Sequence, residues 1–191
     1  MSQILSFKIT IKNSSPKIWR RFEIDDTLTF HDLHLVIQLV MGWTNSHLYR
    51  FIYEANSFIG IPEHINEEGD NDVIDSKKLM LSEFYDQPEM KLIYEYDFGD
   101  SWRHELVLEK IREGTLKYPI CFEGEMRCPP EDCGGLSGYY HLLSNFKNKK
   151  HPEHKEVVEW VGSDFHPDEF NIASVNESLK DYKIFDENGD D

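Results

Sequence analysis

Positive charge is scarce in this sequence, which has 20 lysines and arginines against 36 acidic residues and a formal net charge of −16. Nucleic-acid binding depends on basic side chains that neutralise phosphates, so this balance argues against a nucleic-acid partner. Long apolar runs are absent as well, and no stretch approaches the roughly 20 residues that a membrane-spanning helix requires. We therefore expect a protein without membrane contact.

Cysteine is also rare, with Cys121, Cys128 and Cys133 as the full set. An odd number of cysteines in a chain of 191 residues favours free thiols over a disulfide framework, and therefore a cytoplasmic location. The spacing C-x6-C-x4-C lacks the C-x2-C pair of common structural zinc sites. Glycine-rich phosphate-binding motifs are missing too, so the sequence does not indicate a nucleotide-binding loop.

Alternating and helical hydrophobic patterns are present, and they predict an α+β fold. Residues 4–13 and 17–24 alternate apolar and polar side chains, which indicates two antiparallel strands. A helix is predicted between the capping residue Thr29 and Gly42. Residues 47–54 predict a third strand, so the N-terminal unit reads β-β-α-β.

The rest of the chain predicts a central hairpin and C-terminal helices. Residues 62–77 are acidic and poor in large apolar side chains, as in a surface loop. A hairpin turn follows near Gly99, and helical patterns begin near Ser137. We expect a mostly antiparallel sheet in a single domain over residues 1–185, with a disordered acidic tail at 186–191.

The hairpin turn has the sequence YEYDFGDSWRH and carries several groups capable of acid and base chemistry. A two-residue or four-residue loop would pair Asp97 with Trp102 and Glu95 with His104, which would place these side chains on one face. His104 and Glu95 are then candidates for a catalytic acid and base pair. The same pattern is also typical of a stable hairpin without catalytic function, and a three-residue loop would regroup the two faces.

A second polar stretch, CPPEDCGG, precedes the first C-terminal helix. Cys133 lies just before this helix and is a candidate nucleophile, because a helix N-terminus lowers the pKa of a thiol. We expect this stretch and the hairpin to form one polar binding pocket. Its predicted residues are Asp97, Asp100, Trp102, Arg103, His104, Glu131, Asp132, Gly134, Gly135 and Tyr139.

Part of this pocket is also a candidate site for a divalent metal, because carboxylates and an imidazole together suit a hard or borderline cation. The candidate ligands are Asp97, Asp100, His104, Glu131 and Asp132. The sequence has no specific ligand spacing such as H-E-x-x-H, so the cofactor stays open. Other histidines, among them His31, His34 and His47, are more typical of cap, surface or packing positions.

The order of these motifs resembles the plasmid pRiA4b ORF-three-like family of prokaryotic proteins. The resemblance rests on PKIWRRFEI, LTFHDLHLVIQLVMGWTNSHLYRF, YEYDFGDSWRHELVLEKI, CPPEDCGGLSGYYHLL and HPEHKEVVEWVGSDFHPDEFNIASVNESLK, and it covers residues 4–180. It implies a domain with no established activity. Some similar proteins carry a transposon-resolvase label, but a resolvase must grip DNA phosphates, and six arginines in this acidic chain argue against that role.

We therefore expect a cytoplasmic binding or interaction module for an unknown protein or small-molecule ligand, with a pocket between the hairpin and the CPPEDCGG loop. The alternative is a metal-assisted hydrolase or phosphoryl-transfer enzyme that uses the same residues.

Overall fold

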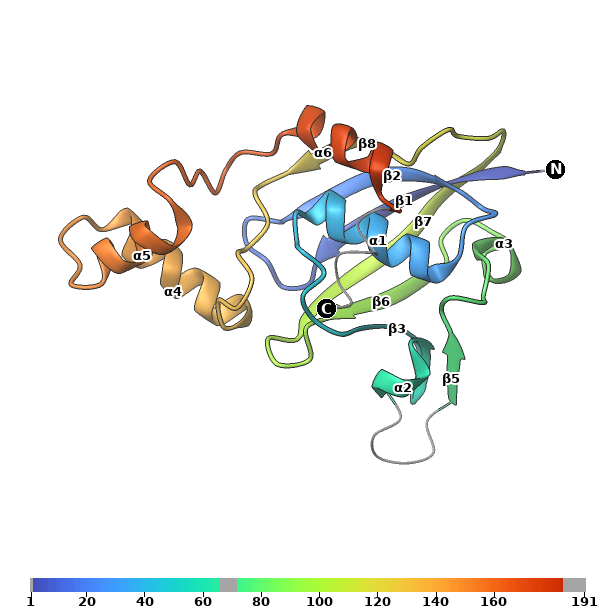
Figure 1. Ribbon diagram of the computed structural model, residues 1–191, viewed down its shortest axis with the longest axis horizontal. Helices are drawn as coiled ribbons and strands as arrows, with labels where there is room; N and C mark the ends of the chain where they lie inside the picture. Colours follow the sequence, from blue (N-terminus) through green and yellow to red (C-terminus); the bar gives the residue numbers. More distant parts are fainter. Residues whose placement is uncertain (1, 66–71, 184–191) are drawn as a thin grey trace.

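The structure, a computed structural model, describes residues 2–65 and 72–183. Its strands are β1 (Gln3–Ile11), β2 (Trp19–Asp25), β3 (Tyr49–Glu54), β4 (Ser57–Gly60), β5 (Asp72–Asp75), β6 (Lys91–Tyr96), β7 (Trp102–Glu113) and β8 (Ile120–Glu125). Its helices are α1 (Phe30–Met41), α2 (Pro62–Ile65), α3 (Leu81–Phe84), α4 (Gly135–Lys147), α5 (His154–Val161) and α6 (Ile172–Ser178), followed by a 3-10 turn at Leu179–Asp181. These elements confirm the predicted α+β fold (Figure 1). The predicted tail at 186–191 lies outside the described residues.

Within the described residues, eight strands form one sheet in the order β5-β4-β3-β6-β7-β1-β2-β8. Neighbouring strands are antiparallel, except that β4 and β5 run parallel. The prediction of a loop over residues 62–77 is wrong at both of its described ends, which form α2 and β5. Four-residue elements in a polar stretch carry too little periodicity for a pattern to indicate them.

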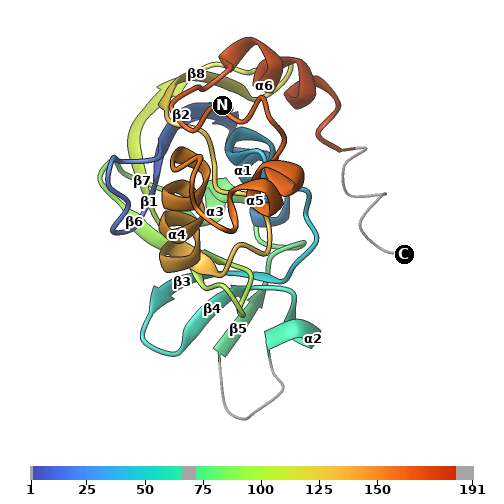
Figure 2. The ribbon, with the colours of Figure 1, turned by 90° about the vertical axis from the view of Figure 1, so that its left-hand side faces the viewer.

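Helix α1 lies in the hollow of the curved sheet and supplies much of the core (Figure 2). Thr29 accepts a hydrogen bond from the Asp32 backbone N–H (3.1 Å), and the Asp32 carboxylate accepts one from the Thr29 N–H (2.9 Å). This is the capping box that the sequence predicts. Gly42 ends the helix with a φ of 101°, a left-handed conformation that favours glycine.

The opposite face of the sheet carries ion pairs between strands. Arg21 on β2 bonds Glu109 on β7 (2.8 Å) and Glu123 on β8 (2.6 Å), and Arg112 bonds Glu23. β2 and β7 alternate buried and accessible residues because one face of the sheet packs on the core, and the cross-strand pairs lie on the more accessible face.

The C-terminal helices occupy two separate positions relative to the sheet. Helices α4 and α5 extend beyond one end of it, and the chain then returns so that α6 lies beside β8 (Figures 1 and 2). There the Asn176 side chain accepts a hydrogen bond from the Cys121 N–H and donates one to the Cys121 carbonyl, both at 2.8 Å. No helix in the described part of the chain is long and apolar enough to cross a membrane.

Candidate functional site

The β6–β7 hairpin has a five-residue loop, so its register differs from the predicted one. Tyr96 pairs with Trp102, and Glu95 pairs with Arg103. The predicted pairing of Glu95 with His104 is therefore wrong. A loop with an odd number of residues moves one strand by one position, and each of its side chains changes face relative to the partner strand.

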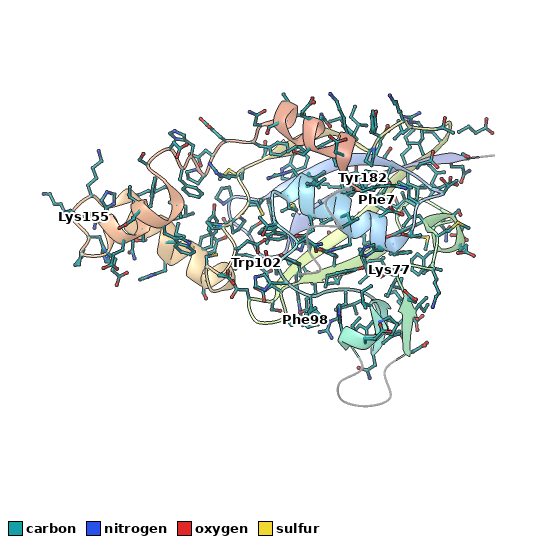
Figure 3. The ribbon with its side chains drawn as sticks, in the orientation of Figure 1. Phe7, Lys77, Phe98, Trp102, Lys155 and Tyr182 are labelled. Atoms are coloured by element: carbon teal, nitrogen blue, oxygen red, sulfur yellow. The ribbon has the colours of Figure 1, made fainter. Side chains whose placement is uncertain are left out.

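Trp102, His104 and Tyr139, predicted as pocket residues, are buried in the core (Trp102 is labelled in Figure 3). His104 Nδ1 lies 3.2 Å from the Tyr94 carbonyl oxygen, which can only accept a hydrogen bond, so Nδ1 carries the proton. Burial lowers the pKa of His104 to about 4. His104 is thus a neutral core residue, and neither the acid–base role nor the metal-ligand role fits its position.

Glu95 and Arg103 lie on the other side of the hairpin, away from that core. The Glu95 carboxylate is almost fully buried and accepts hydrogen bonds from Arg50 (2.7 Å), Arg103 (2.8 Å) and Ser101 (2.8 Å). Burial alone would raise the pKa of this carboxyl, but the bonds from Arg103, Ser101 and Arg50 hold it below its ordinary value. Glu95 is therefore an ionised partner of two arginines, not a proton-transfer group.

The hairpin turn and the CPPEDCGG loop are in direct contact, as the predicted pocket requires. The Gly134 N–H donates to Asp100 Oδ2 at 3.0 Å. At Gly135, a Cβ atom would lie 2.6 Å from the Asp100 carbonyl oxygen, so a side chain there would push the two segments apart. The glycines at the start of α4 thus allow the close approach of the two loops.

A third segment, the loop from Trp43 to Leu48 after α1, completes the site, and sequence reasoning missed it. Trp43 Nε1 donates to the Pro129 carbonyl (3.2 Å), and the Thr44 N–H donates to Glu131 Oε1 (2.9 Å). The backbone of the hairpin turn also bonds this loop, because the Asp97 N–H donates to the Leu48 carbonyl (2.9 Å). The three loops therefore hold one another in place.

His47, on this third loop, faces three carboxylates. Its Nε2 atom lies 3.2 Å from Asp132 Oδ1, 3.8 Å from Asp97 Oδ2 and 3.9 Å from Glu131 Oε2. The donor atoms of His47, Asp97 and Asp132 all lie within 4.8 Å of one another. Both His47 Nε2 and Glu131 Oε2 are buried and make no hydrogen bond within the described residues.

Two of these carboxylates are oriented by hydrogen bonds to their other oxygen. Asp97 Oδ1 accepts from the backbone N–H groups of Gly99 (2.9 Å) and Asp100 (3.2 Å). Glu131 Oε1 accepts from Thr44 and from the Tyr96 hydroxyl (3.1 Å). In each case the remaining oxygen is the one that faces His47, so the cluster is organised in advance.

Cys133 lies close to this cluster, but its surroundings oppose a nucleophilic role. Burial raises the pKa of its thiol to about 12, and the negative charge of Asp100 acts in the same direction. A protonated thiol is a poor nucleophile, so the helix N-terminus does not produce the activation that the sequence suggests.

The structure therefore regroups the predicted metal ligands. Asp97, Glu131 and Asp132 converge, whereas Asp100 uses its Oδ2 atom to bond Gly134. The imidazole that joins them is that of His47, not the predicted His104. Only a polar loop between a helix end and a strand hints at His47 in the sequence, and no ligand spacing identifies it.

A second histidine, His34 of α1, organises the loop from its buried side. Its Nδ1 atom lies 2.8 Å from the Tyr94 hydroxyl, and its Nε2 atom lies 2.7 Å from Asn45 Oδ1. Gln38 completes the network: it donates to the Tyr94 hydroxyl (2.9 Å) and accepts from the Asn45 N–H (3.0 Å). Burial lowers the pKa of His34 to about 3, so the network is built around a neutral imidazole.

Comparison with known proteins gives a consistent family relationship. Residues 3–174 match the model of the family described as plasmid pRiA4b ORF-3-like protein. The chain is 34% identical over 184 residues to the uncharacterized protein y4hQ of Sinorhizobium fredii, which covers 95% of this chain and 93% of that protein. It is 36% identical to a protein of unknown function, MM3350 from Methanosarcina mazei Go1, whose crystal structure matches with a TM-score of 0.77 over 90% of this chain and 97% of that one. The chain therefore belongs to the plasmid pRiA4b ORF-3-like family.

Proposed function

We propose that this protein is a metal-binding module that holds a divalent cation between the hairpin turn, the CPPEDCGG loop and the loop after α1. The observation that carries the proposal is the position of His47 Nε2, which is buried, lies within 4 Å of three carboxylates and hydrogen-bonds none of the described residues. Carboxylates gathered this closely repel one another unless a positive charge lies among them. A divalent cation supplies that charge.

The separations between donor atoms support a shared cation. Around a metal with ligand bonds of about 2.1 Å, adjacent ligand atoms lie about 3.0 Å apart in octahedral geometry and about 3.4 Å apart in tetrahedral geometry. His47 Nε2 lies 3.2 Å from Asp132 Oδ1. It lies 3.8 Å from Asp97 Oδ2 and 3.9 Å from Glu131 Oε2. The two longer separations exceed these values, so binding of an ion requires the Asp97 and Glu131 oxygens to move closer to His47 Nε2. One imidazole with carboxylates suits Mn²⁺ or Zn²⁺.

Metal-assisted hydrolysis or phosphoryl transfer is a second candidate function, and the exposure of one ligand favours it. The Asp132 side chain is 73% exposed, so solvent and small molecules reach the cluster from that side. A catalytic metal needs such an open position to polarise a substrate or to activate water.

Isothermal titration calorimetry with Mn²⁺ and Zn²⁺ tests the metal site. We expect one ion per chain, with the affinity reduced at least about tenfold in His47→Gln and in Asp132→Asn, because each loses one ligand. His166→Gln, at an exposed position outside these three loops, is the matched control and should bind as the unmodified protein does. Absence of binding, or undiminished binding by His47→Gln, would rule out the proposed site.

The organisation and location of the protein are also proposals. We propose a single domain over residues 1–185, supported by Leu179 and Tyr182, which pack in the same core as α1. The three free cysteines support a reducing compartment such as the cytoplasm. The net charge of −16 supports a small-molecule or protein partner over a nucleic acid.

A further inference from the structure

A cavity of about 260 Å³ adjoins the cluster of carboxylates and shares His47 with it. One wall comes from His31 on α1 and from the loop that carries His47. Other lining residues are Ile61, His64 on α2 and Lys77 in the turn after β5 (Lys77 is labelled in Figure 3). The cavity therefore lies beside the proposed cation.

The described walls of this cavity are rich in hydrogen-bond donors. Its ten described lining residues include four histidines and one lysine, and none is Asp or Glu. This composition contrasts with a chain that has 36 acidic residues. His34 is neutral and fully engaged beneath the surface, whereas His64 and Lys77 are exposed at the rim. A hollow with several hydrogen-bond donors and a lysine at its rim suits a ligand that accepts several hydrogen bonds, such as an anion.

The cavity also has an apolar part. The side chains of Leu48 and Ile61 line it, and so does Tyr49, whose ring stacks on His34 at a centroid distance of 3.5 Å. Small-molecule sites combine apolar walls with a few placed polar groups. Its volume of about 260 Å³ is large enough for one aromatic ring that carries one charged group.

We infer that this cavity binds a small organic phosphate, with the phosphate group between Lys77, His64 and the cation at His47, and the organic part against Leu48 and Ile61. A phosphate has enough oxygens to accept from several donors and to contact a divalent metal at the same time. The inference rests on the proposed metal site for one of these three positive groups.

Calorimetric titration of phenyl phosphate into the Mn²⁺-loaded protein tests this inference, with inorganic phosphate and phenol as the two parts of the probe. We expect phenyl phosphate to bind more tightly than either part. Lys77→Gln and His64→Gln should each raise its Kd about tenfold, because each removes one charged or polar contact. Lys78→Gln is the matched control, since Lys78 follows directly in the chain but pairs with Asp75 (2.8 Å) and does not line the cavity.

The outcomes separate failure of the cavity from failure of the metal site. If Mn²⁺ binds but phenyl phosphate does not, or if Lys77→Gln and His64→Gln bind it as well as Lys78→Gln, the inference is wrong and the metal site stands. Phenol that binds as tightly as phenyl phosphate also overturns it. If Mn²⁺ does not bind, the metal proposal fails. Titration of the metal-free protein then decides the inference: loss of phenyl phosphate binding in Lys77→Gln supports it, and equal binding overturns it.

Discussion

His34 on α1 and His47 on the loop after α1 are close in the chain, yet their environments differ. His34 is buried, neutral and bonded through both ring nitrogens, to Tyr94 and Asn45. His47 has three carboxylates around Nε2, and this atom hydrogen-bonds none of the described residues. The first histidine completes a network within the protein, whereas the second stands among carboxylates.

A structural histidine and a candidate ligand differ in the partners that surround the imidazole ring. The neighbours of His34 offer one acceptor and one donor, which is what a neutral imidazole needs. The neighbours of His47 Nε2 are three negatively charged carboxylate oxygens, all of them hydrogen-bond acceptors, and such a set suits a shared metal ion. Three experiments test whether the two histidines have different roles.

The largest expected effect is on stability at acidic pH. Burial lowers the pKa of His34 to about 3 and that of His104 to about 4, whereas a histidine in an unfolded chain has a pKa of about 6.5. Between about pH 6.5 and 4 the unfolded chain therefore binds more protons, and the free energy of unfolding falls as the pH falls. The slope is up to about 1.4 kcal/mol per pH unit for each histidine. Urea unfolding at pH 7, 6 and 5 measures it, and a flat profile would contradict two neutral buried histidines.

Substitution by alanine should separate the two histidines next. His34→Ala removes a fully buried ring and leaves the Tyr94 hydroxyl and Asn45 short of partners, so we expect a loss of about 3 kcal/mol in the free energy of unfolding. His47→Ala should change it by about 1 kcal/mol or less in metal-free protein, because no hydrogen bond of Nε2 is lost. Comparable losses in the two variants, measured by urea unfolding at pH 7.5, would show that both residues are structural.

The smallest effect concerns the orientation of Glu131. Tyr96→Phe removes the hydroxyl that donates to Glu131 Oε1 (3.1 Å) but leaves the bond from Thr44. We expect a two- to fivefold weaker affinity for Mn²⁺, about 0.5 to 1 kcal/mol, with a small change in the melting temperature. Phe98→Leu, a change of an exposed side chain on the same hairpin, serves as the control (Phe98 is labelled in Figure 3). Unchanged Mn²⁺ affinity in Tyr96→Phe would mean that Thr44 alone orients this carboxylate.

The parts of the fold that the sequence predicts well are those with local signals. Thr29, Asp32 and Gly42 mark the two ends of α1 within the chain segment that forms it, and the structure has the helix between them. The polar residues of the hairpin turn and of the CPPEDCGG loop predict their contact, and the fit of Gly135 against Asp100 gives it a physical basis.

The parts that the sequence does not predict depend on loop length and on distant contacts. Asp97 and Ser101 both adopt positive φ, 56° and 53°, although neither is glycine, and this allows a five-residue loop where the pattern suggests a shorter one. Because the loop has five residues and not four, Glu95 and His104 lie on opposite faces of the hairpin. His47 meets Asp97 and Asp132 only because three loops converge, and their positions in the chain carry no spacing rule.

The hydrogen bonds between Asn176 and Cys121 have a consequence for how molecules of this protein meet. Strand β8 is an edge of the sheet, and an edge offers backbone groups on which a strand of another molecule can pair. At Cys121 both groups are already taken, because the amide of Asn176 presents a donor and an acceptor as a neighbouring strand would. The Asn176 side chain thus ends the sheet at this point. It hinders a strand of another molecule from pairing with β8 beside the exposed Ile120 and Phe122.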